Sequence, residues 1–158
     1  MVKTLFKLKA NQTKKSRLVV QGIQHHQNLK TKNFSPVISF DTLLFIIVLT
    51  KYLNFKISIL DVTGAFLQSK FTDEENIYIF VPKGYNETNT TLFKLNLPLY
   101  GLPRSPKDFY MTIKNFLLSL KFNISSHDLC LFYKLENGSL IYVTTVHVDD
   151  LYLASSIR

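Results

Sequence analysis

Two adjacent carboxylates between two β-type runs constrain the fold of this chain more than any other feature. Residues 140–148 and 151–153 are rich in β-branched and aromatic side chains, and Asp149 and Asp150 lie between them. The pattern predicts a hairpin with the acidic pair at or beside its turn. Two interpretations stay open. One is a solvated turn, which aspartate favours. The other is a divalent-metal site, which needs a third carboxylate from elsewhere in the chain.

Asp61 is the candidate for that third carboxylate. It ends a segment in which Phe55, Ile57 and Ile59 alternate with polar residues, as in a strand with one face in a core. Strict alternation puts Asp61 on the same face as Ile59, where an unpaired buried carboxylate would be costly. Gly64 follows, and it permits a break in the strand or the close approach of a ligand. We therefore expect Asp61 at a strand end that turns out toward a cleft.

Composition predicts a globular intracellular protein. With 158 residues and 46% hydrophobic content, the chain can bury the core of one domain or slightly more. The single cysteine, Cys130, excludes an internal disulfide framework, and no Cys/His spacing resembles a zinc site. Residues 1–10 lack the apolar region of a signal peptide. The longest wholly apolar run, 43–49, is far too short to span a bilayer. We expect a cytoplasmic or nuclear location and no membrane partner.

The positive charge of the chain is concentrated near its beginning. The net charge is +8, and residues 1–40 contain eight lysines or arginines but no aspartate or glutamate. Such a patch attracts polyanions such as nucleic acid or nucleotide phosphates. A solvated basic tail is the alternative. The apolar residues 18–20 resemble a buried strand, however, which would hold Lys14, Lys15 and Arg17 on an ordered element.

The remaining periodicities predict two helices and several strands. One helix is expected over 42–53, capped by Asp41 and buried because it is apolar nearly all round, and another over 105–121. Loops are expected at 21–33 and 85–90. In chain order, strands are expected at 18–20, 55–61, 77–81, 91–97, 128–134 and 139–148. The segment 91–97 is expected to pair with 77–81, and the turn at 136–138 to separate the last two strands. This mixture predicts an α+β fold, with both helices on one face of an antiparallel sheet and the three carboxylates on the other.

Eight short blocks follow one another in an informative order. They are Phe6–Lys9, Lys15–Gly22, Phe34–Val37, Leu60–Leu67, Ile77–Gly84, Leu99–Leu102 followed by Ser105 and Pro106, His127–Tyr133, and Val148–Asp150. Together they resemble the reverse transcriptase of copia-type LTR retrotransposons over nearly the whole chain. The resemblance implies a partial reverse-transcriptase domain without thumb or RNase H. Its fingers would be about 1–36 and 69–107, and its palm about 37–68 and 108–158.

The same resemblance implies a set of site residues. Asp61 and Asp149 would hold two Mg²⁺ ions that activate the primer 3′-hydroxyl and clamp the in-line phosphoryl transfer. Asp150 would support them as a third catalytic carboxylate. The implied partners are an RNA template, a DNA primer and deoxynucleoside triphosphates, whereas the oligomeric state stays open.

Four further residues would bind the incoming nucleotide. Lys15 and Arg17 match the basic strand that neutralises the triphosphate. Phe66 matches an aromatic gate against the ribonucleotide 2′-hydroxyl, although a core phenylalanine is the alternative interpretation. Arg104 occupies a position where the family usually has a nucleotide-contacting glutamine.

Departures from the family pattern bear on activity. His147 replaces the usual tyrosine before Val-Asp-Asp, and Phe109 replaces a tryptophan. The sequence ends eight residues after Asp150, before the primer-gripping segment and thumb, so we expect an RNA-directed DNA polymerase fragment that is inactive alone. Two other classes stay open. One is a non-catalytic nucleic-acid-binding relic that uses the basic fingers, and the other is a decaying reading frame without selected function.

Overall fold

The protein divides into two units, each with its own hydrophobic core. The computed structural model describes residues 2–20, 33–72, 76–81 and 92–156. The first unit contains Met1–Phe34 and Phe66–Phe109, and the second contains Ser35–Ala65 and Tyr110–Arg158. The loop predicted for 85–90, and that for 21–33 apart from its last residue, lie outside the described residues.

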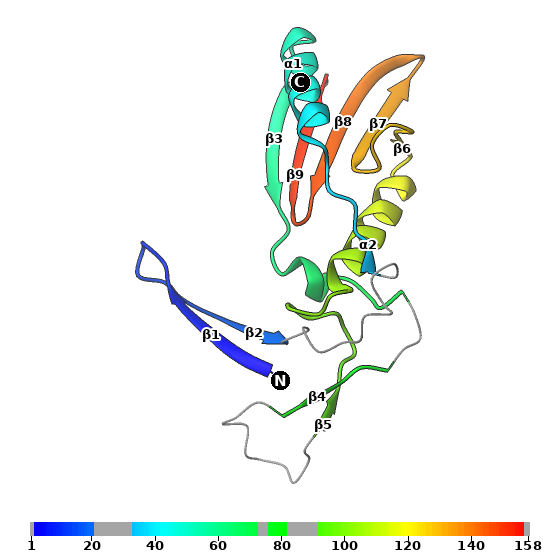
Figure 1. Cartoon of the computed structure of the whole chain (residues 1–158). Coiled ribbons are helices and arrows are strands. Elements are labelled where there is room, and N and C mark those ends of the chain that lie inside the picture. The colour runs from blue at the N-terminus through cyan, green and yellow to red at the C-terminus, as the bar shows by residue number, and fades with distance from the viewer. Residues whose placement is uncertain (1, 21–32, 73–75, 82–91, 157–158) are drawn as a thin grey trace. The chain divides into compact units, whose positions relative to one another are not determined.

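A five-stranded antiparallel sheet forms the centre of the second unit (Figure 1). Its strands, in spatial order, are β3 (Lys56–Asp61), β9 (Asp150–Ser155), β8 (Ser139–His147), β7 (Leu131–Glu136) and β6 (Asn123–Ile124). β7 and β8 are joined by Asn137 and Gly138, with φ of 51° and 77°. Two successive residues at positive φ are what a two-residue type I′ hairpin turn requires. The strands predicted over 55–61 and 139–148, and the turn between β7 and β8, are confirmed.

Two strands of this sheet differ from the sequence prediction. β6 was not predicted, because two residues are too short for a periodic signal. β7 begins at Leu131, three residues later than predicted, because the segment before it forms a turn. In that turn the Leu131 amide donates to the Asp128 carbonyl oxygen at 3.0 Å, and the Cys130 amide donates to the Asp128 carboxylate at 2.9 Å.

The two helices begin and end by capping interactions. α1 (Phe40–Tyr52) is capped by Ser39, whose hydroxyl accepts from the Thr42 amide at 3.1 Å, so the predicted cap at Asp41 is wrong. α2 (Ser105–Ser119) begins where it was predicted. Both helices end in a Schellman arrangement, with Asn54 and Lys121 at φ of 54° and 66°. Helix positions were thus readable from sequence to within two residues.

The two helices pack on opposite faces of the sheet, contrary to the sequence prediction. Ile46 of α1 packs with Val143 and Ala154, whereas Leu117 of α2 packs with Val146 and Leu151. Val143 pairs with Ala154, and Val146 with Leu151. Residues three apart on a strand point to opposite faces. We call these faces the α1 face and the α2 face. The expectation that both helices share one face is therefore wrong.

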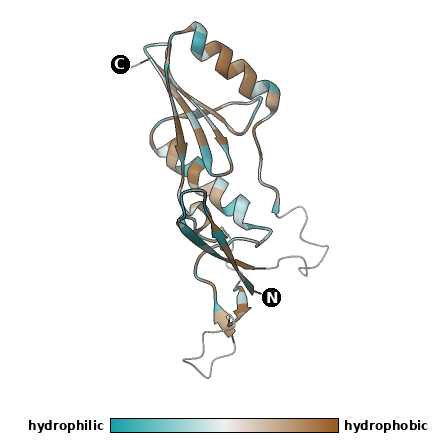
Figure 2. Cartoon of the chain, turned by 90° about the vertical axis from the view of Figure 1, so that its left-hand side faces the viewer, coloured by the Kyte–Doolittle hydropathy of each residue, from teal (hydrophilic) through white to brown (hydrophobic). Residues whose placement is uncertain are grey.

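α1 is also less buried than its composition predicted. Only Ile46 and Thr50 are buried, while the side chains of Phe45 and Val48 are 62% and 67% exposed. Figure 2 shows the hydrophobic colouring along this helix. The buried stripe at spacing i, i+4 contacts the sheet, and Leu49 packs beside it, whereas Phe45 and Val48 point away. Overall apolarity does not say how many faces of a helix are covered.

The described strands of the first unit form two pairs. β1 (Val2–Leu8) pairs with β2 (Lys14–Val20), and β4 (Tyr78–Phe80) with β5 (Leu92–Lys94), each antiparallel. The predicted pairing of the segments 77–81 and 91–97 is confirmed, whereas β1 was not predicted. The core consists of Val20, Ile79, Leu99 and Leu102, with Val2 and Leu18 packed against it. Among the described residues, no helix is long and apolar enough to cross a membrane.

A groove on the α2 face contains a buried hydroxyl without a partner. The groove has a volume of about 360 Å³ and is lined mainly by apolar side chains, among them Leu60, Leu120 and Leu153. Thr144 also lines it and is 1% exposed, and its Oγ1 has no hydrogen-bond partner among the described residues. A buried polar atom in this state destabilises the fold.

Replacing Thr144 with valine is expected to raise the free energy of unfolding by about 1 kcal/mol, because the change removes an unpartnered hydroxyl at constant shape. Thr50→Val is the matched control. Thr50 is fully buried, and its hydroxyl is 2.6 Å from the Tyr152 hydroxyl and donates to the Ile47 carbonyl at 3.1 Å. That variant should lose roughly 1 kcal/mol. Urea denaturation measures both, and a Thr144→Val variant less stable than wild type would contradict the expectation.

Asp128 fastens the start of α1 to the turn before β7. Burial raises the pKa of its carboxyl group, but hydrogen bonds from the Ser39 and Cys130 amides and from the Thr42 and Ser39 side chains outweigh burial and hold it below 3.8. The amide of Ser39 donates to this carboxylate at 3.0 Å. The ionised form is therefore favoured by the fold.

Asp128→Asn is expected to be less stable than wild type by an amount that depends on pH. Because the folded pKa of Asp128 is below the unfolded value of 3.8, its contribution is fully present above pH 3.8 and is lost as pH falls through the folded pKa. The difference in urea midpoint should therefore be constant from pH 7 to pH 5 and shrink below pH 3.8. Glu136→Gln, at an exposed position, is the control. A difference that grows on acidification would refute this account.

Two neighbouring groups are kept neutral. Burial, followed by electrostatic repulsion from Asp128 and from Cys130 once its thiol ionises, raises the pKa of Tyr110 to about 12. Burial and the charge of Asp128 raise the pKa of the Cys130 thiol to about 12 as well. The Tyr110 hydroxyl donates to the Leu129 carbonyl at 2.8 Å. The single cysteine is thus a protonated core residue at neutral pH, since thiolate is the reactive form.

Candidate functional site

The acidic pair lies at the hairpin that joins β8 to β9. His147 and Asp150 are paired across the hairpin, which leaves Val148 and Asp149 as its two-residue turn. Val148 has φ of 55°. Positive φ at a β-branched residue is a genuine outlier that costs roughly 1–3 kcal/mol and is found mainly at functional sites. Backbone strain is therefore held at the residue just before Asp149.

The register of the sheet places Asp61 directly opposite Asp150. The two are Cα partners at the ends of β3 and β9, and the Val62 amide donates to the Asp149 carbonyl at 2.9 Å. That bond makes Asp61 and Asp150 a non-hydrogen-bonded pair, the type in which side chains approach most closely. Both side chains are exposed. Like charges directly opposite each other destabilise a sheet unless a cation compensates them.

Strand pairing brings Asp61, Asp149 and Asp150 to the same end of the sheet, but the three side chains are not arranged as a set of metal ligands. Carboxylate oxygens are the ligands that Mg²⁺ prefers, so the donor chemistry of Asp61, Asp149 and Asp150 fits this ion. Among the described residues, no group of three or more His, Cys, Asp or Glu side chains is arranged to hold a metal. Two facing carboxylates with a third on the adjoining turn are what the fold provides.

Asp61 and Asp150 lie on the α1 face, not on a face free of helices. Alternation along β9 places Asp150 on the same face as Tyr152 and Ala154, and Asp61 shares it as the partner of Asp150. His147, paired with Asp150, lies there too. Sequence reasoning placed the carboxylates opposite both helices, which fails because the helices are on different faces. The expectation that Asp61 is on the same side as Ile59 and at a strand end is confirmed.

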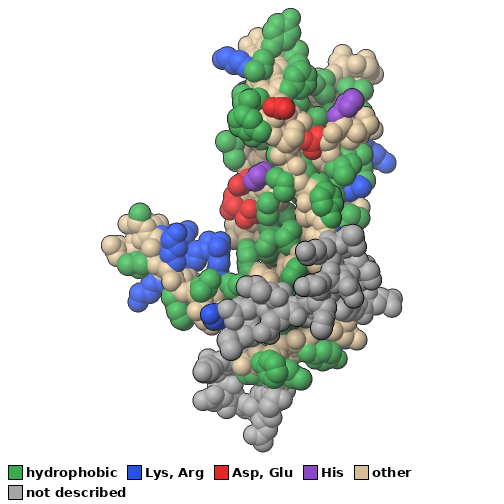
Figure 3. Space-filling view, in the orientation of Figure 1, with side chains coloured by type: hydrophobic (Ala, Val, Ile, Leu, Met, Phe, Trp, Pro, Cys, Tyr) green, Lys and Arg blue, Asp and Glu red, His purple; other side chains and the backbone are tan. Residues whose placement is uncertain are grey.

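In the first unit, Lys15 and Arg17 are exposed residues of β2. Lys15 pairs with Lys7, and Val19 with Lys3. Alternation puts Lys3, Lys7, Lys15 and Arg17 on one face of the hairpin, which we call the cationic face. The other face carries Val2, Leu18 and Val20 into the core. Figure 3 shows lysine and arginine side chains gathered over this hairpin.

Lys3 and Lys7 were not identified as candidate site residues from the sequence. The signal was present in part, because Lys3 and Lys7 are four residues apart and so share one face of a strand. Lys7 directly opposite Lys15 is a repulsive cross-strand pair. A pair of this kind concentrates positive potential on one surface, which favours anion binding.

Phe66 and Arg17 meet at a residue that the sequence did not single out, Tyr100. The guanidinium carbon of Arg17 is 5.1 Å from the centroid of the Tyr100 ring, a cation–π distance. The Phe66 and Tyr100 ring centroids are 4.9 Å apart with planes tilted by 53°, and Phe109 meets Phe66 edge-on at 6.3 Å. The Phe66 side chain is half-buried in this aromatic group. The structure thus brings two of the four predicted nucleotide residues together.

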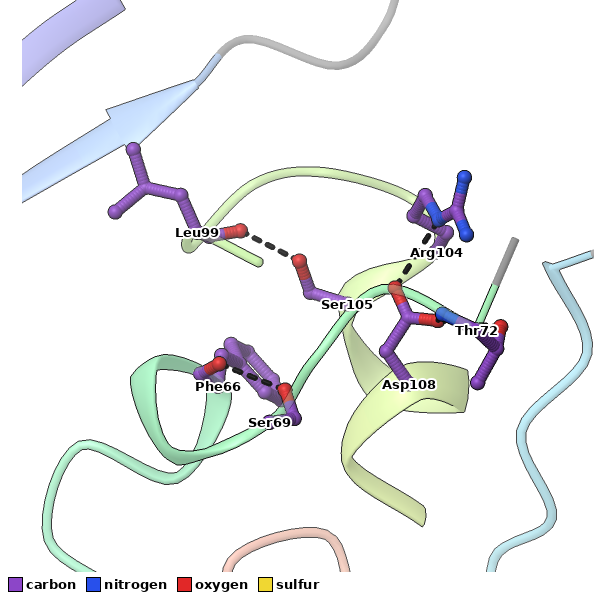
Figure 4. Close-up of polar contacts among 7 residues, drawn as sticks. All are labelled: Phe66, Ser69, Thr72, Leu99, Arg104, Ser105 and Asp108. Carbon is purple, nitrogen blue, oxygen red and sulfur yellow. Dashed lines mark hydrogen bonds and ion pairs between the residues drawn. The ribbon is translucent and has the colours of Figure 1, made fainter. Parts of the chain in front are cut away.

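Arg104 is buried and ion-paired instead of extending into solvent (Figure 4). Its Nε donates to the Asp108 carboxylate at 3.0 Å, and its guanidinium lies 5.1 Å from the Phe71 ring. The other carboxylate oxygen of Asp108 accepts from the amide and hydroxyl of Thr72 at 3.1 and 2.7 Å. These contacts join the start of α2 to the segment after Phe66.

The predicted site residues are therefore divided between the two units. Asp61, Asp149 and Asp150 belong to the second unit, whereas Lys15, Arg17, Phe66 and Arg104 belong to the first. Within the second unit the fold gathers acidic residues at one end of an antiparallel sheet. Within the first it presents basic residues on a hairpin beside an aromatic group.

The fold is α+β, with facing aspartates at a strained hairpin in one unit and a basic hairpin in the other. The model of the family described as reverse transcriptase (RNA-dependent DNA polymerase) matches residues 2–157. The chain therefore belongs to the reverse transcriptase family.

Curated relatives from plants and yeast narrow the assignment within the reverse transcriptase family, and they confirm the resemblance to copia-type retrotransposons. The chain is 32% identical over 145 residues to the retrovirus-related Pol polyprotein from transposon RE1 of Arabidopsis thaliana, covering 90% of this chain and 10% of that protein. It is 30% identical over 142 residues to the corresponding polyprotein from transposon TNT 1-94 of Nicotiana tabacum, covering 88% and 10%.

A yeast relative is the truncated transposon Ty1-A Gag-Pol polyprotein of Saccharomyces cerevisiae, 32% identical over 115 residues, which covers 72% of this chain and 9% of that protein. No solved structure is a significant match. The chain thus spans about one tenth of the length of the curated relatives that it matches.

Proposed function

We propose that this chain is the part of a retrotransposon reverse transcriptase that carries the polymerase carboxylates and the nucleotide-binding fingers. The fingers would be about 1–36 and 69–107, and the palm about 37–68 and 108–158. The division of the chain into two compact units supports this assignment. The reaction would be RNA-directed addition of deoxynucleotides to a DNA primer.

The observation that carries the proposal is the facing pair of Asp61 and Asp150 beside Asp149 on a strained turn. Surface carboxylates placed opposite each other repel, and a fold retains such an arrangement at a cost. A divalent cation converts that repulsion into attraction. Asp61 and Asp149 would hold two Mg²⁺ ions, with Asp150 alongside as support.

The bound ions would supply the acidity and charge compensation that in-line phosphoryl transfer needs. The chain's own residues would bind the nucleotide and select its sugar. Lys15 and Arg17 would neutralise the triphosphate, and Phe66 would press against the sugar and exclude a 2′-hydroxyl. Arg104 completes the set in this proposal, although its Nε already donates to Asp108. An RNA template, a DNA primer and deoxynucleoside triphosphates are the proposed partners.

Metal binding tests the carboxylate site directly. Mn²⁺, titrated into the chain and followed by electron paramagnetic resonance, should bind to wild type and bind more weakly to Asp61→Asn and to Asp149→Asn. Asp41→Asn removes an exposed aspartate in the first turn of α1 and is the matched control. Equal Mn²⁺ binding by all four proteins would overturn the assignment of these carboxylates.

Primer extension separates polymerase from binding module. A chain that is active alone, contrary to the sequence prediction, would show Mg²⁺-dependent incorporation on an RNA template that disappears in Asp61→Asn and Asp149→Asn alike. The cationic face favours a second candidate, a non-catalytic nucleic-acid-binding module. That module would show salt-dependent RNA binding unaffected by Mg²⁺ or by Asp149→Asn, and no incorporation. RNA binding that is unaffected by Mg²⁺ and by Asp149→Asn, without incorporation, would favour the nucleic-acid-binding module over the polymerase fragment.

A further inference from the structure

We propose that Tyr100 is a positioning residue that holds Arg17 and Phe66 in one fixed arrangement for a nucleoside triphosphate. This inference rests on the proposed nucleotide binding by the first unit. It adds a residue that lies in the family block Leu99–Leu102 but that the sequence analysis gave no role in the site. The Tyr100 ring would touch no reacting atom and would act through its two neighbours.

The ring of Tyr100 contacts both neighbours at once. Arg17 lies 5.1 Å from its centroid, and Phe66 lies 4.9 Å away, supported in turn by Phe109 at 6.3 Å. Arg17 comes from an exposed strand and is itself exposed. A long exposed side chain samples many rotamers, and a planar guanidinium resting on an aromatic face loses most of them before a ligand arrives.

The backbone of Tyr100 is fixed independently of its ring. Its carbonyl accepts from the Val20 amide at 2.8 Å, which ties the end of β2 to this turn. One residue earlier, the Leu99 carbonyl accepts from the buried Ser105 hydroxyl at 2.7 Å (Figure 4). The ring is therefore carried by a turn anchored on one side to the strand of Arg17 and on the other to the start of α2.

This arrangement has a consequence for ligand selection. Arg17 provides charge for phosphate, and Phe66 provides an apolar surface for a sugar. Because one ring contacts both, moving that ring would change phosphate affinity and sugar discrimination together. A ring that only filled space would affect stability without linking these two properties.

The test measures binding of a fluorescent deoxynucleoside triphosphate to wild type, Tyr100→Phe and Tyr100→Leu. Tyr100→Leu should weaken binding roughly two- to fivefold, the range expected for losing one exposed cation–π contact. Tyr100→Phe keeps the aromatic face and should bind as wild type does. The preference for deoxy- over ribonucleotide should narrow in Tyr100→Leu alone.

A double-mutant cycle links the effect to Arg17. In the Arg17→Met background, Tyr100→Leu should weaken binding no further, because the cation that the ring positions is absent. Tyr78→Leu, at a 57% exposed tyrosine of the same unit, is the matched control and should bind as wild type does. Circular dichroism melting checks that each variant is folded.

Three results would overturn the inference. Tyr100→Phe binding as weakly as Tyr100→Leu would show that the hydroxyl, not the aromatic face, matters. Additive losses in the double variant would show that Tyr100 acts independently of Arg17. If the wild type binds no triphosphate, the proposed nucleotide site itself is overturned, and this inference with it. The titration of the wild type alone distinguishes that result from a failure of the role proposed for Tyr100.

Discussion

Asp108→Ala is expected to destabilise the first unit by about 3–5 kcal/mol, the cost of leaving a buried cation without its partner. Asp108 is fully buried, and the side chain of Arg104 is 9% exposed. The substitution would also remove the acceptor for the Thr72 amide and hydroxyl. Urea denaturation measures the loss. Hydrogen exchange of the β4 and β5 amides should show that it falls on the first unit.

The double variant Arg104→Met, Asp108→Leu is the informative control. Replacing both members of a buried ion pair with apolar side chains of similar volume is often neutral for stability. The double variant should therefore recover most of the stability that Asp108→Ala loses, apart from the contacts with Thr72. A double variant as unstable as Asp108→Ala would show that packing, not the unpaired charge, accounts for the loss.

Gly101→Ala is expected to detach the end of β2 and lower the free energy of unfolding by about 3 kcal/mol. A Cβ atom at this position would lie 1.9 Å from the Val20 carbonyl oxygen, and Gly101 has φ of +88°. The backbone would have to move, and the hydrogen bond from the Val20 amide to the Tyr100 carbonyl would be lost with it. Faster hydrogen exchange at the Val20 amide is the diagnostic measurement.

Gly138→Ala is the control that separates the cost of positive φ from the cost of the steric clash expected in Gly101→Ala. Gly138 has φ of +77°, but a Cβ atom there would meet nothing within 4 Å. Only the conformational cost should remain, about 1–2 kcal/mol. Equal losses for the two alanine variants would mean that the approach of β2 to Gly101 contributes nothing to stability.

Local patterns in the sequence determined much of the fold. Period-two alternation located β3, a run of β-branched and aromatic residues located β8, and Asn137-Gly138 located the turn before β8. These signals are legible because side-chain direction and turn geometry depend on neighbours in the chain. The acidic pair at the next hairpin, and Asp61 at the end of its strand, were predicted for the same reason.

Other features depended on contacts between distant residues and could not be predicted. Which face of the sheet each helix covers is decided by packing of Ile46 and Leu117 against β8, β9 and β7, and hydropathy does not encode it. α1 was predicted to be buried because it is apolar, yet apolarity does not specify a partner. β6 was too short to carry any pattern.

The candidate site was divided in the same way. The sequence by itself determined which residues could do chemistry: three aspartates, a basic strand and a phenylalanine at a family position. The tertiary structure decided that Asp61 faces Asp150 and that the Arg104 side chain is ion-paired with Asp108. It also decided that Tyr100 joins Arg17 to Phe66. Residue type fixes what a side chain can do, but only register and packing across the chain fix what lies next to it.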